Sequence, residues 1–362
     1  MKIKIKPYDM LFFRNSKPFR KGEDTWADSM ALPNLTTIYG ALRTCYFAEH
    51  PEEIDFASKN NDPTRDLKIN QVCYLYDENE VLYPAPKDLV MKKNMSRADK
   101  FEMEKRKKYK TVKLKCKEFK DIQCSLKMAN NIEHFFTSET EVEEIPMGLI
   151  SKDELMYYSY NYEEICLRSL KDMVVFEEKI GIAREDGKRS AQKSMLYRIS
   201  QVRYEKLEII VDFDGLDIPK EGLLKLGGKG NAVHYNEINL ELINNEEINE
   251  TVDYIKLYLT TPAIFKNGWL PDFINPRTLR GEFLGREVKL ISACVGNYVF
   301  VGGFDIRAGK EKDSFRAVPA GSIYLLEIPE FIMENSILSV SLESELSNQG
   351  YGKAFMIKGD LS

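Results

Sequence analysis

Alternating polar and apolar residues mark the start of the chain as a β-strand. Residues 2–6 read Lys-Ile-Lys-Ile-Lys, and residues 254–260 read Tyr-Ile-Lys-Leu-Tyr-Leu-Thr. Such alternation is typical of a half-buried strand. A phenylalanine, a basic residue and an asparagine follow each strand, as Phe13-Arg14-Asn15 and as Phe265-Lys266-Asn267. This repetition predicts that the chain contains two related halves.

A second signature, Asn-x-x-Thr-aliphatic-x-Gly, predicts a helix near the start of each half. It occurs at residues 34–40 and again at residues 275–281. Asparagine just before an apolar-periodic run is typical of a helix N-cap. Pro276 would lie in the first turn of the second helix, where its fixed φ angle is tolerated. We therefore expect helices to begin after Asn34 and after Asn275.

A third signature, Gly-x-Gly-x-Ala-apolar, lies near the end of each half, at residues 228–233 and 350–355. An apolar strand and a short helix are expected before each copy. These strand and helix pairs would span residues 207–213 and 219–226 in the first half, and residues 322–328 and 334–346 in the second. Each half then reads strand, helix, strands, helix, glycine loop and strand, which is a βαββαβ or ferredoxin-like unit.

The sequence therefore predicts an α+β fold with two ferredoxin-like (RRM-like) domains and antiparallel sheets. The first domain would span residues 1–248 and the second residues 249–362. The second and third signatures lie much further apart in the first half than in the second. This excess predicts an insertion at about residues 50–200.

Opposite charges gather in two parts of this insertion. Residues 92–120 carry thirteen Lys or Arg and four Asp or Glu, whereas residues 139–164 carry eight Asp or Glu and one Lys. Such runs are usually solvated faces; the alternative is that the basic run contacts RNA and the acidic run contacts a basic partner. Over all 362 residues, 52 Lys and Arg against 57 Asp and Glu give a net charge of −5. This excludes a polybasic protein that coats nucleic acid by bulk charge, but it allows binding in a local groove.

The cellular location is predicted from what the sequence lacks. No stretch approaches the ~18 uncharged apolar residues of a membrane span, and no signal-peptide block follows the first residues. The six cysteines are scattered without a Cys-x-x-Cys pair, and only three histidines are present. We expect reduced thiols, no metal or other cofactor, and a cytoplasmic protein.

The glycine loops are candidates for a binding site. Without a Cβ atom, glycine lets backbone N–H groups approach a ligand and form an anion-binding concavity, for which nucleic-acid phosphate is a natural ligand. The alternative is that each Gly-x-Gly merely marks a tight turn. The candidates are Gly227, Gly228, Lys229, Gly230 and Asn231 in the first loop, and Gly350, Tyr351, Gly352 and Lys353 in the second.

Basic residues with aromatic neighbours form a second set of candidates. Cations follow the backbone of a single strand while aromatic rings stack on its bases, and ferredoxin-like sheets are a common platform for RNA. For any one arginine, the alternative is an ordinary surface charge. The candidates are Arg14, Phe19, Arg20, Arg43, Arg184, Arg198, Lys310 and Arg316.

Catalytic signatures are scarce, so we expect no enzymatic activity. The chain has no Gly-x-Ser-x-Gly motif and no His-Asp dipeptide, and residues 302–305 lack the doubled acid of a polymerase palm. His234 follows the first glycine loop, where it is placed to act as a general acid or base in RNA cleavage. The other interpretation is a strand residue that packs or hydrogen-bonds locally.

Several short motifs, spread over nearly the whole chain, together resemble the third subunit of the Cmr complex. That family belongs to the RAMP superfamily and to the type III-B CRISPR effectors. The motifs are Pro-Tyr-Asp-Met-Leu-Phe-Phe-Arg at 7–14 with Pro18-Phe19, Ile-Gly-Ile-Ala-Arg at 180–184, Leu-Tyr-Arg at 196–198, Leu-Gly-Gly-Lys-Gly at 226–230, Thr-Pro-Ala at 261–263 with Gly268-Trp269, Val-Pro-Ala-Gly at 318–321, and Gln-Gly-Tyr-Gly-Lys-Ala at 349–354.

The resemblance implies a non-catalytic RNA-binding role. Proteins of that family cap the 5′ handle of the CRISPR RNA and bridge the large polymerase-bearing subunit to the backbone RAMP subunits. By this resemblance, the loop at residues 227–230 would face the handle backbone, with Arg14, Arg184 and Arg198 as contacts. Family members often carry Glu and Arg where this chain has Lys229 and Asn231, so the side chain that meets phosphate stays open.

Two other functions stay open beside this one. The first is a RAMP-type endoribonuclease that processes precursor CRISPR RNA, with His234 or a tyrosine as the acid or base. The second is a scaffold that makes no RNA contact. A membrane partner is not expected.

Overall fold

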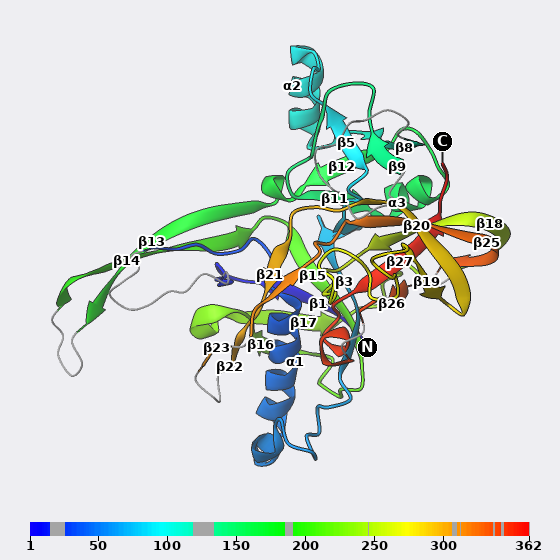
Figure 1. The fold of residues 1–362 in the computed structure, drawn as a ribbon. Helices are drawn as coiled ribbons and strands as arrows, with labels where there is room; N and C mark the ends of the chain where they lie inside the picture. Colours follow the sequence, from blue (N-terminus) through cyan, green and yellow to red (C-terminus); the bar gives the residue numbers. More distant parts are fainter. Residues whose placement is uncertain are drawn as a thin grey trace.

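The computed structural model describes residues 1–14, 26–118, 134–184, 191–244, 246–305, 310–311, 313–335, 337–341 and 344–361. Strands dominate these residues and form seven sheets, two of them large (Figure 1). Among the described strands, one neighbouring pair, β14 with β2, is parallel, and the other pairs are antiparallel. The predicted α+β class with antiparallel sheets is therefore confirmed.

The sheet of the first half has nine strands, in the order β16-β17-β1-β15-β3-β4-β11-β12-β6. Its strands are β1 (Lys2–Pro7), β3 (Lys68–Tyr76), β4 (Glu80–Pro84), β6 (Tyr109–Lys110), β11 (Gly148–Ser151), β12 (Cys166–Ser169), β15 (Leu207–Asp214), β16 (Glu221–Lys225) and β17 (Ala232–Glu237). Helix α1 (Leu35–Glu49) begins directly after Asn34, as predicted. It buries Ile38 and Leu42 in the same core as Ile3 and Ile5 of β1.

The sheet of the second half has six strands, in the order β19-β20-β25-β18-β27-β26. Its strands are β18 (Glu246–Leu259), β19 (Arg280–Phe283), β20 (Arg286–Cys294), β25 (Ile323–Asn335), β26 (Ile337–Ser339) and β27 (Lys353–Lys358). The short helix α4 (Ser344–Asn348) precedes β27.

The two sheets share one strand order at their centres. In the first, β17 pairs with β1, β1 with β15 and β15 with β3. In the second, β27 pairs with β18, β18 with β25 and β25 with β20. When the four strands of each set are numbered along the chain, their order across the sheet is fourth, first, third, second. The strands thus follow ferredoxin-like order, although the complete βαββαβ unit is not confirmed in either half.

The second half lacks the predicted helix after Asn275. The Asn275 side chain instead accepts hydrogen bonds from the amides of Arg277 (2.9 Å) and Thr278 (3.4 Å). Leu279 follows with a left-handed φ of 54°, and the chain enters the hairpin of β19 and β20. Asparagine side chains cap turns and helices by the same bond, which is why the sequence pattern was misleading here.

The helix predicted at residues 219–226 is also wrong, because this segment forms strand β16 and pairs with β17. The helix predicted at residues 334–346 is largely wrong as well. Strand β25 extends to Asn335, β26 occupies residues 337–339, and the helix is reduced to α4. The first half therefore keeps one of its two expected helices, and the second half keeps only the short α4.

The extra segment of the first half lies between β3 and β15, at residues 77–206, rather than at residues 50–200. Besides strands of the main sheet it contains β5 (Leu89–Lys92), α2 (Arg97–Arg106), β7 (Val112–Lys113), β8 (Lys115–Glu118), β9 (His134–Thr137), β10 (Val142–Glu143), α3 (Lys152–Ser159), β13 (Val174–Arg184) and β14 (Ala191–Tyr204). Helix α2, from the basic run, buries none of its residues, which agrees with a solvated face. Figure 1 shows α2 and the β13–β14 hairpin extending away from the body of the molecule.

A buried ion pair joins the two halves. Asp88 lies 3.0 Å from the ammonium of Lys256 on β18, and the side chains of these residues are 0% and 3% exposed. The hydroxyl of Tyr158 donates to the same carboxylate at 2.7 Å. Apolar residues of both halves, among them Tyr83 and Phe355, form one core together with Tyr158. The interface between the halves therefore buries one acidic and one basic side chain, and each of these charges has a partner of opposite sign.

The remaining elements are short. They are β2 (Trp26–Ala27), β21 (Val299–Val301), β22 (Phe304–Asp305), β23 (Lys310–Glu311), β24 (Phe315–Ala317), and the 3-10 turns η1 (Pro51–Phe56), η2 (Leu170–Asp172) and η3 (Gly228–Gly230). No helix among the described residues is long and apolar enough to cross a membrane.

Candidate nucleic-acid interface

The first glycine loop closes the hairpin of β16 and β17. The amide of Leu226 donates to the carbonyl of Asn231 at 3.0 Å, and η3 fills the turn between them. Gly227 and Gly230 have φ angles of +81° and +67°. These left-handed conformations favour glycine, so the turn itself requires these two residues.

Two glycines of this loop allow close packing against the segment that follows β1. The amide of Gly228 donates to the carbonyl of Phe12 at 2.8 Å. A Cβ atom at Gly227 would lie 2.6 Å from that carbonyl oxygen, and one at Gly228 would lie 2.9 Å from the Phe12 ring. At Gly230, by contrast, nothing lies within 4 Å of the Cβ position. The first two glycines therefore serve the protein's own packing, and the third faces open space.

The segment at residues 10–14 is fixed from both sides. The Asn231 side chain donates to the carbonyl of Met10, and Leu11 exchanges hydrogen bonds of 2.7 and 2.8 Å with Val202 on β14. The Phe13 amide donates to the hydroxyl of Ser29 at 2.9 Å. The segment thus lies between the glycine hairpin and the base of the β13–β14 hairpin. It ends at Arg14, which is exposed and pairs with Ser29.

Arg198 lies in the same neighbourhood as Arg14. It is paired in register with Trp26 of β2, and the chain that follows β2 reaches Ser29, the partner of Arg14. The Arg198 side chain is 38% exposed and forms an ion pair with Glu178 on β13. Opposite Arg198 on the hairpin, Ile180 is 75% exposed. The short segment from Trp26 to Ser29 therefore pairs with both predicted arginines, and an exposed apolar side chain lies opposite Arg198.

Several predicted residues cannot be placed in this site. Phe19 and Arg20 lie outside the described residues. For Arg184, Lys229 and Lys310 the description covers the backbone but not the side chain. Their proposed contacts stay predictions from the sequence.

Arg43, which was predicted as an RNA contact, is engaged within the fold. Its guanidinium donates to Asp62 and, at 2.7 Å, to the hydroxyl of Thr64. The same carboxylate accepts the amide of Ser58 at 2.6 Å. Burial alone would raise the pKa of Asp62, but the hydrogen bonds from Thr64 and Ser58 together with Arg43 bring it below its usual value. Arg43 therefore holds the loop after α1.

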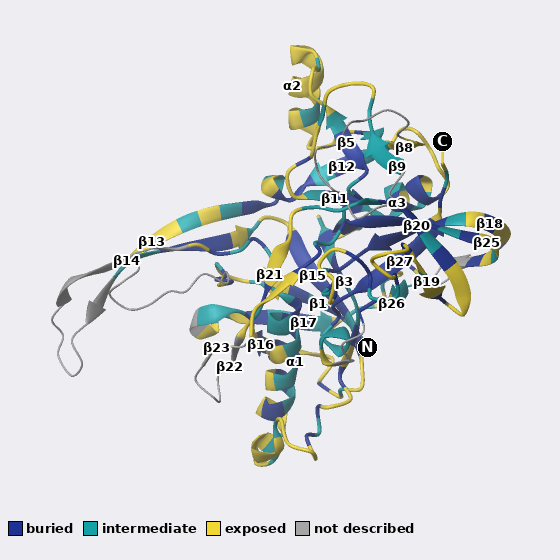
Figure 2. Ribbon diagram, in the orientation of Figure 1, coloured by how far each residue is buried: buried dark blue, intermediate teal, exposed yellow. Residues whose placement is uncertain are grey.

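The second glycine loop, which was also predicted as an RNA contact, is buried. Tyr351 is 1% and Lys353 5% exposed, and Figure 2 shows β27 largely in the colour of buried residues. Every backbone amide of the loop has an acceptor within the protein. Gly350 donates to Ser347, Tyr351 to Leu346, Gly352 to Pro262 and Lys353 to the hydroxyl of Thr261. No amide of the loop is left for a phosphate.

This second loop instead packs against the first half. A Cβ atom at Gly350 would lie 2.9 Å from the side chain of Ile69 on β3, and the Tyr351 hydroxyl lies 3.1 Å from that of Thr36 on α1. Burial, with a smaller contribution from Lys68, lowers the pKa of Lys353 to about 8. Sequence reasoning missed this role because the covering surface comes from residues of the first half that are distant in sequence, Thr36 being 315 positions from Tyr351.

Arg316 lies on the two-stranded ribbon of β21 and β24, beside two aromatic residues that sequence reasoning missed. Its guanidinium lies over the ring of Tyr298, 4.9 Å from the centroid, and it pairs across the ribbon with Phe300. Both rings are about half exposed. Their spacing of two residues was the available signal, because Phe300 lies on β21 and Tyr298 directly precedes that strand, so an extended chain places both side chains on one face.

His234 lies on β17, next to the glycine hairpin. Its Nε2 atom is 2.9 Å from a carboxylate oxygen of Glu221 on β16, and its ring centroid is 6.0 Å from that of the exposed Tyr8. The contact with Glu221 is of the kind that stabilises a two-stranded sheet.

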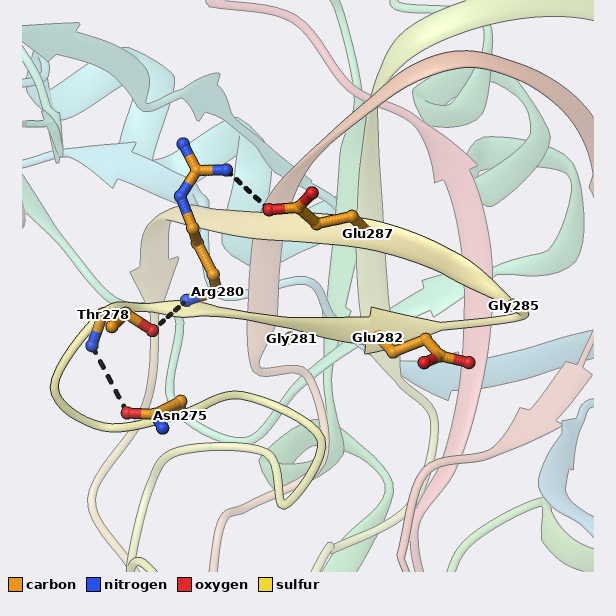
Figure 3. Close-up of a pocket in the computed structure, with 7 residues that line it drawn as sticks. All are labelled: Asn275, Thr278, Arg280, Gly281, Glu282, Gly285 and Glu287. Atoms are coloured by element: carbon orange, nitrogen blue, oxygen red, sulfur yellow. Dashed lines mark hydrogen bonds and ion pairs between the residues drawn. The ribbon is translucent and has the colours of Figure 1, made fainter.

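An open cavity of about 510 Å³ lies at the hairpin of β19 and β20. Figure 3 shows that Arg280 points to Glu287, at a distance of 2.8 Å, and that Glu282 also lines the cavity. The single arginine is thus paired with an acid, and a second acid lies nearby, which does not favour phosphate. None of the predicted site residues lines this cavity.

Comparisons with known proteins match this chain over most of its length. The family model described as CRISPR-associated protein (Cas_Cmr3) matches residues 3–359. A chain of the Type III-B Cmr-beta structure bound to cognate target RNA is similar with a TM-score of 0.52, 16% identity, and coverage of 90% of this chain and 86% of that chain. The same complex bound to cognate target RNA and AMPPnP gives a TM-score of 0.51 with the same identity and coverage. At this identity the structures show a shared fold. A search of curated proteins gave no match.

Proposed function

The chain belongs to the Cas_Cmr3 family of CRISPR-associated proteins, as its motifs indicated, and from this membership we propose that it is a non-catalytic RNA-binding subunit of a type III-B Cmr effector complex. Its ligand is the 5′ handle of the CRISPR RNA. Its protein partners are the large polymerase-bearing subunit and the backbone RAMP subunits, between which it forms a bridge. The Cmr-beta chains that share its fold come from complexes bound to target RNA.

The observation that carries this proposal is the gathering of Arg14, Arg198 and the glycine hairpin around the segment at residues 10–14. Arg14 is exposed at the end of that segment, and the hydrogen bonds of Phe12 and Met10 fix the segment to the hairpin. A guanidinium held on a fixed backbone loses less freedom when it binds a phosphate, which raises affinity. The glycine hairpin therefore acts mainly by positioning the strand that carries Arg14.

The β13–β14 hairpin supplies the second side of the proposed RNA path. It extends away from the body beside this segment (Figure 1) and exposes Ile180 and Phe176, 75% and 47% respectively. Exposed apolar side chains next to cations suit single-stranded RNA, whose bases stack on protein while its phosphates meet charge. The net charge of −5 indicates modest affinity for the isolated chain. Neighbouring subunits would raise it by holding the RNA in place.

The experiment removes the predicted cations together. A variant with Arg14→Ala, Arg184→Ala and Lys229→Ala should lose at least tenfold in affinity for handle RNA. It should also show a shallower dependence of affinity on salt, because fewer counterions are released. The matched control removes three positive charges from the second half, by Lys266→Ala, Arg280→Ala and Arg286→Ala. This control should bind RNA like the wild type. Equal affinity of the two variants in filter binding would contradict the proposal.

The alternative of an endoribonuclease has one observation in its favour, the closeness of His234 to Glu221 and Tyr8. General acid–base chemistry needs such groups within hydrogen-bond reach of the scissile phosphate. The purified chain should leave labelled precursor RNA uncut in the absence of metal. Cleavage that disappears in His234→Ala would replace the binding function with a catalytic one.

The alternative of a scaffold without RNA contact is separated by crosslinking within the assembled complex. RNA that crosslinks to this chain supports the binding function. RNA that crosslinks only to neighbouring subunits supports the scaffold.

A further inference from the structure

The ribbon of β21 and β24 presents an aromatic and arginine cluster to solvent. Tyr298 is 55% and Phe300 47% exposed, and their rings meet edge to face with centroids 5.4 Å apart. Arg316 pairs with Phe300 across the ribbon and lies over the ring of Tyr298. We name these three residues the ribbon cluster.

On the opposite face of the ribbon, two side chains anchor it to the body, whereas Val299 and Phe315 on the same face are 38% and 37% exposed. Val301 and Ala317 are 2% and 1% exposed and belong to the core of the first half, which also contains Leu11 and Phe13. At its base, Val318 exchanges hydrogen bonds of 2.7 and 2.9 Å with Ala263 of the second half. The ribbon is thus held by both halves, and the exposed rings are not required to hold it.

Exposed aromatic rings on a rigid support are a platform for stacking. Arg316 covers one face of the Tyr298 ring, and the two half-exposed rings still present surface on which a further planar group can stack. Arginine beside such rings adds a cation that stacks on bases as well as meeting phosphates. The cluster shares its supporting core with the segment that leads to Arg14, so a strand of RNA held at Arg14 has this platform on the same body.

We propose that the ribbon cluster stacks an unpaired base of the bound RNA, adding base contact to the phosphate contacts made around Arg14. This inference rests on the RNA-binding function proposed above. It assigns a role to Tyr298 and Phe300 and gives Arg316 a stacking role rather than a purely ionic one.

The test compares a double variant with a matched control. Tyr298→Ala with Phe300→Ala should weaken binding of single-stranded handle RNA about tenfold, within the range measured for one stacked base. The salt dependence should stay unchanged, because no phosphate contact is removed. The control, Tyr160→Ala with Tyr162→Ala, removes two rings that are 57% and 58% exposed elsewhere and should bind RNA like the wild type. Thermal unfolding of both variants should match the wild type.

An abasic scan of the RNA identifies the stacked base. Removal of that base should weaken RNA binding to the wild-type protein by the same factor as the double substitution does. It should cause no further loss of RNA affinity in the double variant. Wild-type affinity in the double variant, with the wild type binding normally, would overturn the platform and leave the RNA-binding function standing. Failure of the wild type itself to bind RNA would overturn both. Loss of a co-purifying subunit with unchanged RNA affinity would make the cluster a protein contact and overturn the platform.

Discussion

The two glycine loops of this chain share a sequence pattern, but they lie in opposite surroundings. The loop at 226–231 closes an exposed hairpin, and Gly230 has open space at its Cβ position. The loop at 349–353 is buried against the first half, with all its amides bonded within the protein. Both contain glycines with positive φ angles. The pattern therefore reports a turn, and only the surroundings decide whether the turn can meet a ligand.

The largest expected effect is a loss of stability when a glycine of the buried loop is replaced, with a smaller loss for the same change in the exposed loop. Gly352 and Gly230 have nearly equal φ angles, +71° and +67°, so alanine introduces similar backbone strain at both. At Gly352 the new Cβ atom would also lie 2.5 Å from that of Ser341. We expect Gly352→Ala to lower the free energy of unfolding by about 3 kcal/mol and Gly230→Ala by about 1 kcal/mol. Urea unfolding measures both, and equal losses would contradict the difference in surroundings.

The next change should raise the free energy of unfolding instead of lowering it. Lys353 is buried with a pKa near 8, so its charged form is disfavoured in the folded chain. Lys353→Met should raise the free energy of unfolding at pH 7 by about 2 kcal/mol. Between pH 8 and the unfolded pKa of 10.5, the unfolded chain binds more protons, so wild-type stability should rise with pH through this window. The variant should lack this rise and should bind RNA normally; weaker RNA binding would restore the second loop as an RNA contact.

A smaller effect should appear only in RNA binding. Arg14→Ala should weaken handle binding about tenfold, because one hydrogen bond to a charged group contributes about 1.5 kcal/mol. The slope of affinity against salt should fall by about one counterion. Unfolding should be unaffected, because Arg14 is exposed. A loss of stability with unchanged RNA affinity would show that Arg14 stabilises the fold and does not contact RNA.

The smallest effect concerns the contact between the second loop and α1. Tyr351→Phe removes the hydroxyl that lies 3.1 Å from that of Thr36 and accepts its amide at 3.3 Å. The expected loss is about 1 kcal/mol of unfolding free energy, with RNA affinity unchanged. A Thr36→Val variant should lose a similar amount, and combining both should add little further. Full additivity would show that the two side chains act separately.

The strands were more predictable from sequence than the helices. Alternation at residues 2–6 and 254–260 identified β1 and β18, which occupy the same position in their sheets. The helix after Asn34 formed because Ile38 and Leu42 follow at helical spacing and face the core. The Asn275 side chain stabilises a turn instead, and local propensity could not separate the two outcomes.

The site was predictable only in part, because burial depends on distant residues. Arg14 and Arg198 were identified from local motifs and lie near one another. Arg43 and Lys353 looked like them in sequence, yet a carboxylate at Asp62 engages the first and the other half of the molecule covers the second. Tyr298 and Phe300 were missed because aromatic residues in or beside a short strand are more often core than surface.

Photo-crosslinking tests the central claim most directly. Handle RNA carrying 4-thiouridine would be bound to the wild-type chain, irradiated, and the attached peptides identified by mass spectrometry. We predict crosslinks within residues 10–14 and 226–231 and none within residues 349–353. Crosslinks at the second loop, or a bound RNA that labels neither region of the first half, would contradict the claim that one glycine loop supports the RNA site and the other supports the fold.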